Sequence, residues 1–143
     1  MTAKEFENGV LSCKDQMFRA AFCITRSDAD AEDAVCEAII KAYTHLDSLK
    51  HKRAFRAWML KIVIREGYRI VRTRADAVSI ENADALPAGL DSYEEDGLLY
   101  YVNLLPEELR LPVLLFYFEG MRTAEIANQL GIPEGTVGSR LNR

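Results

Sequence analysis

The sequence has no long apolar run. Its 143 residues hold no stretch that approaches the ~18 consecutive apolar residues of a membrane-spanning helix. Residues 1–7 also lack the basic start and the apolar core of a signal peptide. With 49% hydrophobic and 28% charged residues, the composition is typical of a globular protein. We therefore expect a cytoplasmic protein with no direct membrane insertion.

Cysteine is also scarce. The three cysteines, Cys13, Cys23 and Cys36, are odd in number and form no C-x-x-C pair, which argues against a disulfide framework. Even together with His45, their spacing matches no structural zinc motif. We expect three reduced, buried thiols, no metal and no cofactor. No nucleophile–base pair or phosphate-binding loop is present either, so we do not expect an enzyme.

Strand-like alternation is missing, whereas apolar residues at helical spacing are common. We expect an all-α fold of two small helical domains, 1–74 and 93–143. They are joined by an acidic linker, 75–92, where periodicity is weak and Pro87 and Gly89 occur. The predicted helices are 3–12, 15–26, 28–48, 53–74, 93–104, 106–120, 123–130 and 133–143. The fourth is expected to turn most of these residues inward, with Trp58 in the core: Phe55, Trp58, Met59, Ile62, Val63 and Tyr68.

Basic residues are absent between Ala75 and Leu109, where nine acidic residues lie. The preceding segment, Lys50–Arg74, has nine basic residues and one acid, Glu66. Further upstream, Asp28–Glu37 has five acids and no Lys or Arg. The net charge of −4 would by itself argue against a nucleic-acid partner, but it averages over a basic block between two acidic ones.

Four cations of the basic block recur at i, i+4, i+8 and i+11, which places them along one stripe of a helix. They are Lys61, Arg65, Arg69 and Arg72. A phosphate backbone would relieve their mutual repulsion. The Asp28–Glu37 cluster has two open interpretations. It is either a partner surface or a solvated helix start, in which Ser27 and Asp30 form a capping box.

The last third of the chain has the pattern of a helix-turn-helix. Thr123 can cap a helix that ends at Gly131, and Pro133 opens the next. Its core positions are Ala127, Gly131 and Val137: small Ala lets the second helix approach, Gly permits a left-handed turn, and Val fills the shared core. The face free to enter a major groove includes Thr136, Ser139, Arg140 and Arg143. A helical hairpin that binds nothing is the alternative.

Three segments carry a resemblance to a known family. LPEELRLPVLLFYFEGMRTAEIANQLGIPEGTVGSRLNR (105–143) is similar to the C-terminal promoter-reading domain of sigma-70 factors. DADAEDAVCEAIIKAYTHL (28–46) and FRAWMLKIVIREGYRIVR (55–72) resemble the N-terminal domain of the extracytoplasmic-function (ECF) group. The resemblance implies that 1–74 is a region 2-like domain that binds core RNA polymerase and melts the minus-ten element. It implies that 93–143 is a region 4-like domain that reads the minus-thirty-five element.

The same resemblance implies roles for individual residues. Asp33 and Glu37 would contact core polymerase, whose clamp helices and flap are the expected docking sites. The loop 47–52 and the helix after it would capture a flipped base. The cations expected on DNA are Lys50, His51, Lys52, Lys61, Arg65, Arg69 and Arg72. Promoter DNA and an anti-sigma factor are the other partners implied.

Four features depart from the family pattern. Cys36 stands where Gln is common, Arg65 where many members have the Asn that helps hold the flipped base, and Gly138 at a commonly basic position. Relatives continue past Arg143 with a basic helical stretch, so the end is expected to be a natural shortening or a trimmed chain. Two other functions stay open: a stand-alone DNA-binding regulator, and a sigma-like decoy that binds an anti-sigma factor and no DNA.

Overall fold

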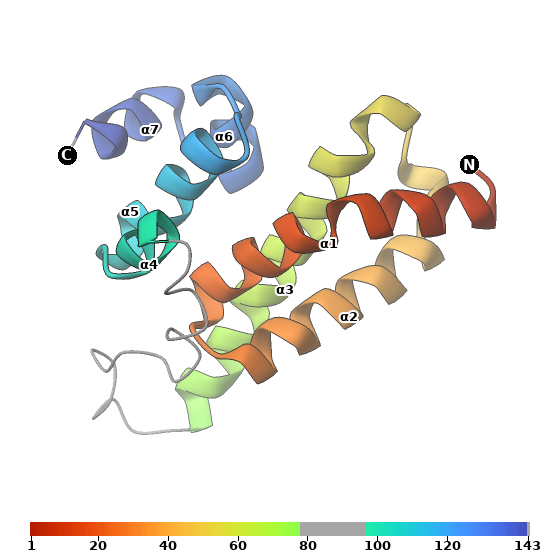
Figure 1. Cartoon of the computed structure of the whole chain (residues 1–143), viewed down its shortest axis with the longest axis horizontal. Coiled ribbons are helices and arrows are strands. Elements are labelled where there is room, and N and C mark those ends of the chain that lie inside the picture. Colours follow the sequence, from red (N-terminus) through yellow and green to blue (C-terminus); the bar gives the residue numbers. More distant parts are fainter. Residues whose placement is uncertain (78–96, 143) are drawn as a thin grey trace. The chain divides into compact units, whose positions relative to one another are not determined.

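The computed structural model describes the backbone of residues 1–77 and 97–142, and within these ranges every regular element is helical (Figure 1). This confirms the all-α expectation. The chain forms two compact units, Met1–Ser79 and Ile80–Arg143. Among the described residues, no helix has the length and apolar character required to cross a membrane.

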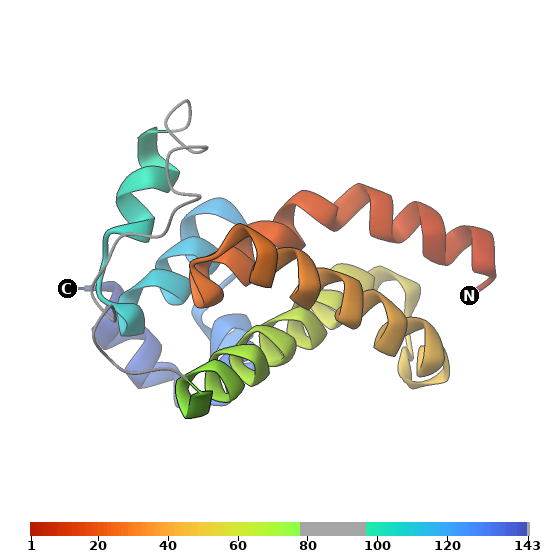
Figure 2. The same cartoon turned by 90° about the horizontal axis from the view of Figure 1, so that it is seen from below.

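Unit 1 is a bundle of three long helices, each in contact with the other two (Figures 1 and 2). Two short 3₁₀ turns, η1 and η2, connect the second helix to the third. The elements are α1 (Ala3–Thr25), α2 (Asp28–Thr44), η1 (Leu46–Ser48), η2 (Lys52–Ala54) and α3 (Phe55–Ala77). The first residues of the expected linker, 75–77, thus continue α3, and the remainder from 78 lies outside the described residues.

The first helix differs from the expectation of two helices, 3–12 and 15–26. α1 is continuous because nothing at residues 13–14 interrupts it: Cys13 faces the core and contacts Met17 one turn later, with the two sulfur atoms 3.6 Å apart. A capping box between Thr2 and Glu5 fixes the start of the helix. The left-handed conformation of Arg26, with φ 57°, ends it.

The core of unit 1 depends on small residues of α2. Four alanines at helical spacing are completely buried and allow α1 and α3 to approach closely: Ala31, Ala34, Ala38 and Ala42. Large side chains such as Phe22 and Met59 fill the remaining space. The expected inward face of α3 is partly wrong, because Trp58, Ile62 and Tyr68 are only half-buried.

The cysteines also differ from expectation. Cys13 and Cys23 are buried free thiols, but Cys36 is exposed. The reason lies in its register on α2. Cys36 is two residues from both Ala34 and Ala38, and residues two apart on a helix do not share a face. The expectation of three buried thiols is therefore wrong for Cys36.

One cation of the basic block is a structural tie. Ser27 caps α2 by accepting the Asp30 N–H, but the Asp30 carboxylate does not complete a capping box. It accepts a hydrogen bond of 2.6 Å from Arg74, whose guanidinium also donates to the carbonyl of Thr25 at 3.0 Å. Arg74 thereby fastens the end of α3 to the junction between α1 and α2.

Unit 2 consists of shorter elements. They are α4 (Gly97–Asn103), α5 (Glu107–Val113), a π-helical segment η5 (Leu114–Phe118), α6 (Thr123–Leu130) and α7 (Glu134–Leu141). The expected helix 106–120 is thus divided. Pro112 has no N–H for the α-helical ladder, and after it the Glu119 N–H bonds the carbonyl of Leu114, five residues earlier. Gly120, with φ 66°, ends the segment.

Candidate nucleic-acid interface

The turn between α6 and α7 has the geometry that its sequence predicts. Gly131 adopts φ 67°, and the N–H groups of Gly131 and Ile132 both donate to the carbonyl of Ala127, at 2.9 and 3.2 Å. Val137 and Ile126 are completely buried between the helices, whereas Ala127 itself is half-buried. The three expected core positions therefore meet at one helix-turn-helix.

The start of α6 differs in detail. Arg122, not Thr123, is the capping residue, and its N–H donates to the Glu125 carboxylate at 3.2 Å. The Thr123 hydroxyl donates instead to the carboxylate of Glu134 at 2.8 Å, which ties the first turns of α6 and α7 together. A local cap was expected because the sequence alone does not show that Glu134 lies nearby.

The outward face of α7 carries few charges. Ser139 is exposed, Thr136 and Arg140 are half-buried, and Arg143 lies outside the described residues. A Cβ atom added to Gly138 would meet nothing within 4 Å. The helix therefore presents mostly small polar groups to a ligand, and Arg140 is the only cation among its described residues.

The stripe of four cations on α3 is not uniform. Arg65 and Arg72 are exposed and Lys61 is half-buried, and within the described ranges none of the three forms an ion pair. Arg69 differs, because its Nε donates to the carboxylate of Glu66 at 2.8 Å. Sequence reasoning placed all four on one stripe and missed this pairing, although Glu66 and Arg69 are three residues apart on one helix, a spacing at which opposite charges can pair.

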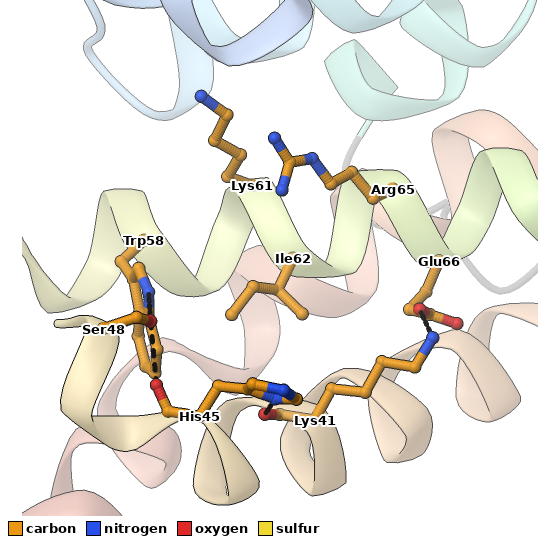
Figure 3. A pocket seen from close by; sticks show the side chains of 8 residues that line it. All are labelled: Lys41, His45, Ser48, Trp58, Lys61, Ile62, Arg65 and Glu66. Atoms are coloured by element: carbon orange, nitrogen blue, oxygen red, sulfur yellow. Dashed lines mark hydrogen bonds and ion pairs between the residues drawn. The ribbon is translucent and has the colours of Figure 1, made fainter.

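A pocket of about 400 Å³ opens beside this stripe, between the end of α2, η1 and α3 (Figure 3). Trp58, Ile62 and Glu66 follow one another along its α3 wall at i, i+4 and i+8. Lys61 and Arg65 also line it, but Figure 3 shows them projecting from the other side of the helix. An aromatic and apolar wall thus lies next to cations, on one helix.

Trp58 lines this pocket instead of filling the core, which corrects the expectation. Its Nε1–H donates to the Ser48 hydroxyl at 3.3 Å, and that hydroxyl donates to the carbonyl of His45 at 2.8 Å. The ring also packs against Phe55, with centroids 5.9 Å apart. These contacts fix the indole between the core and the open pocket.

Glu66 lies at the other end of the pocket and is the one acid of the basic block. Its side chain is only 5% exposed, and it forms ion pairs with Lys41 of α2 and with Arg69. Burial by itself raises the pKa of Glu66, but the hydrogen bonds from Lys41 and then Arg69 lower it by more, so that the net pKa lies below its ordinary value. The carboxylate is therefore ionised at neutral pH.

The loop before α3 is tied to α1. Lys50 and His51 are exposed, whereas the ammonium of Lys52 lies 2.6 Å from the carboxylate of Glu5. This bond, followed by those from Thr2, lowers the pKa of Glu5 to about 2. Of the three loop residues expected on DNA, one is therefore already paired within the protein.

The face of α2 opposite the buried alanines is exposed. Asp33 and Glu37 lie on it, with Ile40 one turn further along and 59% exposed. Sequence reasoning selected the two acids but missed Ile40, because an apolar residue in an amphipathic helix is normally assigned to the core. Within the described ranges, no group of three His, Cys, Asp or Glu side chains is placed to hold a metal ion.

The sequence of this chain matches known proteins in both units. Residues 10–76 match the family described as Sigma-70 region 2, and residues 96–143 match Sigma-70, region 4. Over 132 residues the chain is 32% identical to the ECF RNA polymerase sigma-E factor of Escherichia coli strain K12. This alignment covers 80% of this chain and 69% of that protein. The chain belongs to the ECF group of the sigma-70 family.

Other relatives of this sigma factor agree. It is 28% identical to RNA polymerase sigma factor SigV of Bacillus subtilis, over 91% of this chain and 80% of that one. It is 31% identical to the protein named "Probable RNA polymerase sigma factor RfaY" of Xanthomonas campestris pv. campestris. The chain spans 37% of the length of that protein. Among solved structures, the fold resembles that of the sigma factor RpoE of Bartonella quintana, which was crystallised with the anti-sigma factor NepR. The two structures superpose with a TM-score of 0.77 over 99% of this chain and 92% of that one, and their sequences are 26% identical.

Proposed function

We propose that this sigma factor binds core RNA polymerase, directs it to promoters, and holds a base unstacked from the minus-ten element in the pocket between α2 and α3. The pocket carries the proposal. Trp58 offers an aromatic face for a base, and Ile62 continues the wall along α3 (Figure 3). Stacking on an aromatic side chain is the usual way in which proteins hold single-stranded bases.

The phosphates on either side of such a base need cations nearby. Lys61 and Arg65 project from α3 beside the pocket, and Arg72 continues the stripe two turns on. Lys50 and His51 are exposed on the loop that precedes α3. Placing bases and phosphates on adjoining faces of one helix fits a melted strand that passes along α3.

The proposed docking surface for polymerase is the outer face of α2. Asp33 and Glu37 are the acids we place against the clamp helices, and Ile40 supplies an apolar centre. An apolar residue ringed by charged ones is the usual composition of a protein interface.

For unit 2 we propose recognition of the minus-thirty-five duplex by α7, through Thr136, Ser139 and Arg140, together with contact to the polymerase flap. Binding of this unit to DNA alone is weak in this proposal, because α7 has one described cation with which to neutralise phosphates. The proposed domains are 1–77, which includes the end of α3, and 93–143, and the acidic segment between them is proposed to pass through the polymerase.

The proposal extends to partners and location. An anti-sigma factor is expected to hold this protein inactive in the cytoplasm, as the crystallised relative was solved with one. The protein performs no chemistry of its own, since polymerase forms the phosphodiester bonds.

The test is transcription in vitro with purified core polymerase over a promoter library, which also supplies the minus-ten sequence. 2-Aminopurine placed at each minus-ten position then reports the unstacked base by its fluorescence. We expect Trp58→Ala to lower open-complex formation about tenfold, the effect of losing one stacked base, and to spare core binding. Leu11→Ala, an exposed apolar residue on α1, is the matched control.

Failure of the wild-type chain to bind core polymerase would overturn the proposal. Tight binding to a specific duplex without polymerase would favour a stand-alone regulator. Binding to polymerase with no unstacked base near Trp58 would retain the sigma function but reject the pocket.

A further inference from the structure

The buried acid in the basic block has no place in the proposed contacts with DNA. Glu66 is surrounded in sequence by the cations of α3, and a lone carboxylate there would repel phosphate. The Glu66 side chain is 5% exposed. It forms ion pairs with Lys41 and Arg69, whose side chains are 47% and 46% exposed. The carboxylate thus holds the Lys41 ammonium and the Arg69 Nε in ion pairs, although both side chains remain about half exposed.

We infer that Glu66 is a positioning residue that keeps Lys41 and Arg69 from binding phosphate, and so keeps the pocket an apolar slot for a base. The inference rests on the proposed capture of a base in this pocket. In this role, Glu66 keeps the surface that binds bases separate from the surface that binds phosphates.

The path of Lys41 supports this role. Its side chain extends from α2 beneath Ile62 to the Glu66 carboxylate, at the end of the pocket away from Trp58 (Figure 3). The methylene groups of Lys41 therefore face the pocket, while the ammonium is held at its far end. Without its partner, the ammonium would turn to water or phosphate, because an unpaired cation in an apolar slot is poorly solvated.

Arg69, three residues after Glu66 on α3, is held by the same carboxylate. Its spacing places it on the stripe with Lys61, Arg65 and Arg72, but its Nε bonds Glu66. The two oxygens of Glu66 are divided between the two helices, Oε1 to Lys41 and Oε2 to Arg69. The working phosphate stripe consequently omits Arg69, which sequence spacing alone had included.

The test measures how salt affects binding of the holoenzyme to single-stranded minus-ten oligonucleotides taken from the promoter library. Each phosphate contact contributes about 0.7 to the slope of log affinity against log salt concentration. We expect Glu66→Gln to steepen the slope by up to about 1.4, because two cations are released. Arg69→Gln is expected to keep the wild-type slope, whereas Lys61→Gln makes it shallower by about 0.7.

A second readout separates positioning from general damage. An oligonucleotide that is abasic at the unstacked position should bind the wild-type holoenzyme about tenfold more weakly than the intact one. Glu66→Gln should reduce this penalty, because the slot is disturbed while phosphate binding is kept. Glu7→Gln, which removes the same charge from an exposed pair with Lys4 on α1, should change neither readout.

Two results would overturn the inference: an unchanged or shallower slope in Glu66→Gln, or a slope shallower by about 0.7 in Arg69→Gln. If Glu66→Gln does not fold, as judged by its circular dichroism, the slopes of Arg69→Gln and Lys41→Gln decide, since both should equal that of the wild type. Failure of the proposed function is distinct, because the wild-type holoenzyme would then show no abasic penalty at all.

Discussion

The two units of this sigma factor solve the same problem, presenting side chains to DNA, with very different amounts of internal support. Unit 1 has three long helices around a buried core, with ion pairs between helices at Lys41–Glu66 and Arg74–Asp30. In unit 2 the α-helices have seven or eight residues, below the ~12–15 at which an isolated helix becomes stable.

Exposed aromatic residues occur in both units but are more numerous in unit 2, because among the described residues of unit 1 only Tyr43 is one, at 54% exposed. Tyr101 and Tyr117 of unit 2 are each 65% exposed, and Phe116 and Leu104 are also exposed. Apolar area of this kind on a small unit commonly marks a partner surface. The helices of unit 2 are too short to be stable alone and depend on packing against one another, whereas unit 1 is built from helices long enough to carry a larger core.

The largest expected effect tests the core of unit 1. Phe22 is completely buried, so Phe22→Ala should lower the free energy of unfolding by about 3–5 kcal/mol. Trp58 is the only tryptophan of the chain and lies in this unit, so its fluorescence in a urea titration measures the effect. A loss below about 1 kcal/mol would contradict the rigid core on which the comparison depends.

The ion pairs of Glu66 should make unit 1 sensitive to acid. Because the folded-state pKa of Glu66 lies below its ordinary value of 4.5, its pairs contribute stability above that pH. The contribution is lost as the pH falls from 4.5 through the lower folded-state value. Glu66→Gln should cost about 1 kcal/mol at pH 7 and flatten the acid side of the stability curve.

Urea titrations of the wild type and Glu66→Gln between pH 7 and pH 3, followed by Trp58 fluorescence, provide the measurement. An equal dependence on pH in the two proteins would contradict the role assigned to this carboxylate. Asp28→Asn, at an exposed acid of α2, is a suitable control.

In unit 2, two glycines should respond in opposite directions. Gly138→Ala adds a Cβ that meets nothing within 4 Å and should stabilise α7 by about 1 kcal/mol. Gly131→Ala also meets no atom, but φ at this position is +67°, so the strain should cost about 1 kcal/mol. Hydrogen exchange of the α7 amides measures the change in stability in each variant. A gain in stability in Gly131→Ala would exclude the left-handed turn.

The smallest effect concerns the loop before α3. Lys52→Gln removes the partner of an exposed carboxylate, and exposed pairs contribute little to stability. We expect an unchanged unfolding midpoint, but a rise in the pKa of Glu5 from about 2 toward its ordinary value. Carbon NMR of the Glu5 carboxyl group detects this, and a pKa that stays near 2 would show that the contact with Lys52 is not its cause.

Sequence reasoning succeeded where the cause is local. The two-unit helical fold followed from apolar periodicity, and the helix-turn-helix from the spacing of Ala127, Gly131 and Val137. It failed where partners are far apart in the chain. Trp58 was assigned to the interior, because periodicity cannot show where a neighbouring helix ends and a pocket begins. Cys36 was assigned to the core for a different reason, since its register relative to the alanines of α2 was overlooked.

The sequence by itself determined the turn at Gly131 and the sorting of charge into blocks, because both depend on residues within a few positions of each other. Only the tertiary structure decided which cations are paired with acids far away in the chain. Glu66 meets Lys41 across 25 residues, and Arg74 meets Asp30 across 44. Folding places these charges in contact and leaves Lys61, Arg65 and Arg72 without an ion pair among the described residues.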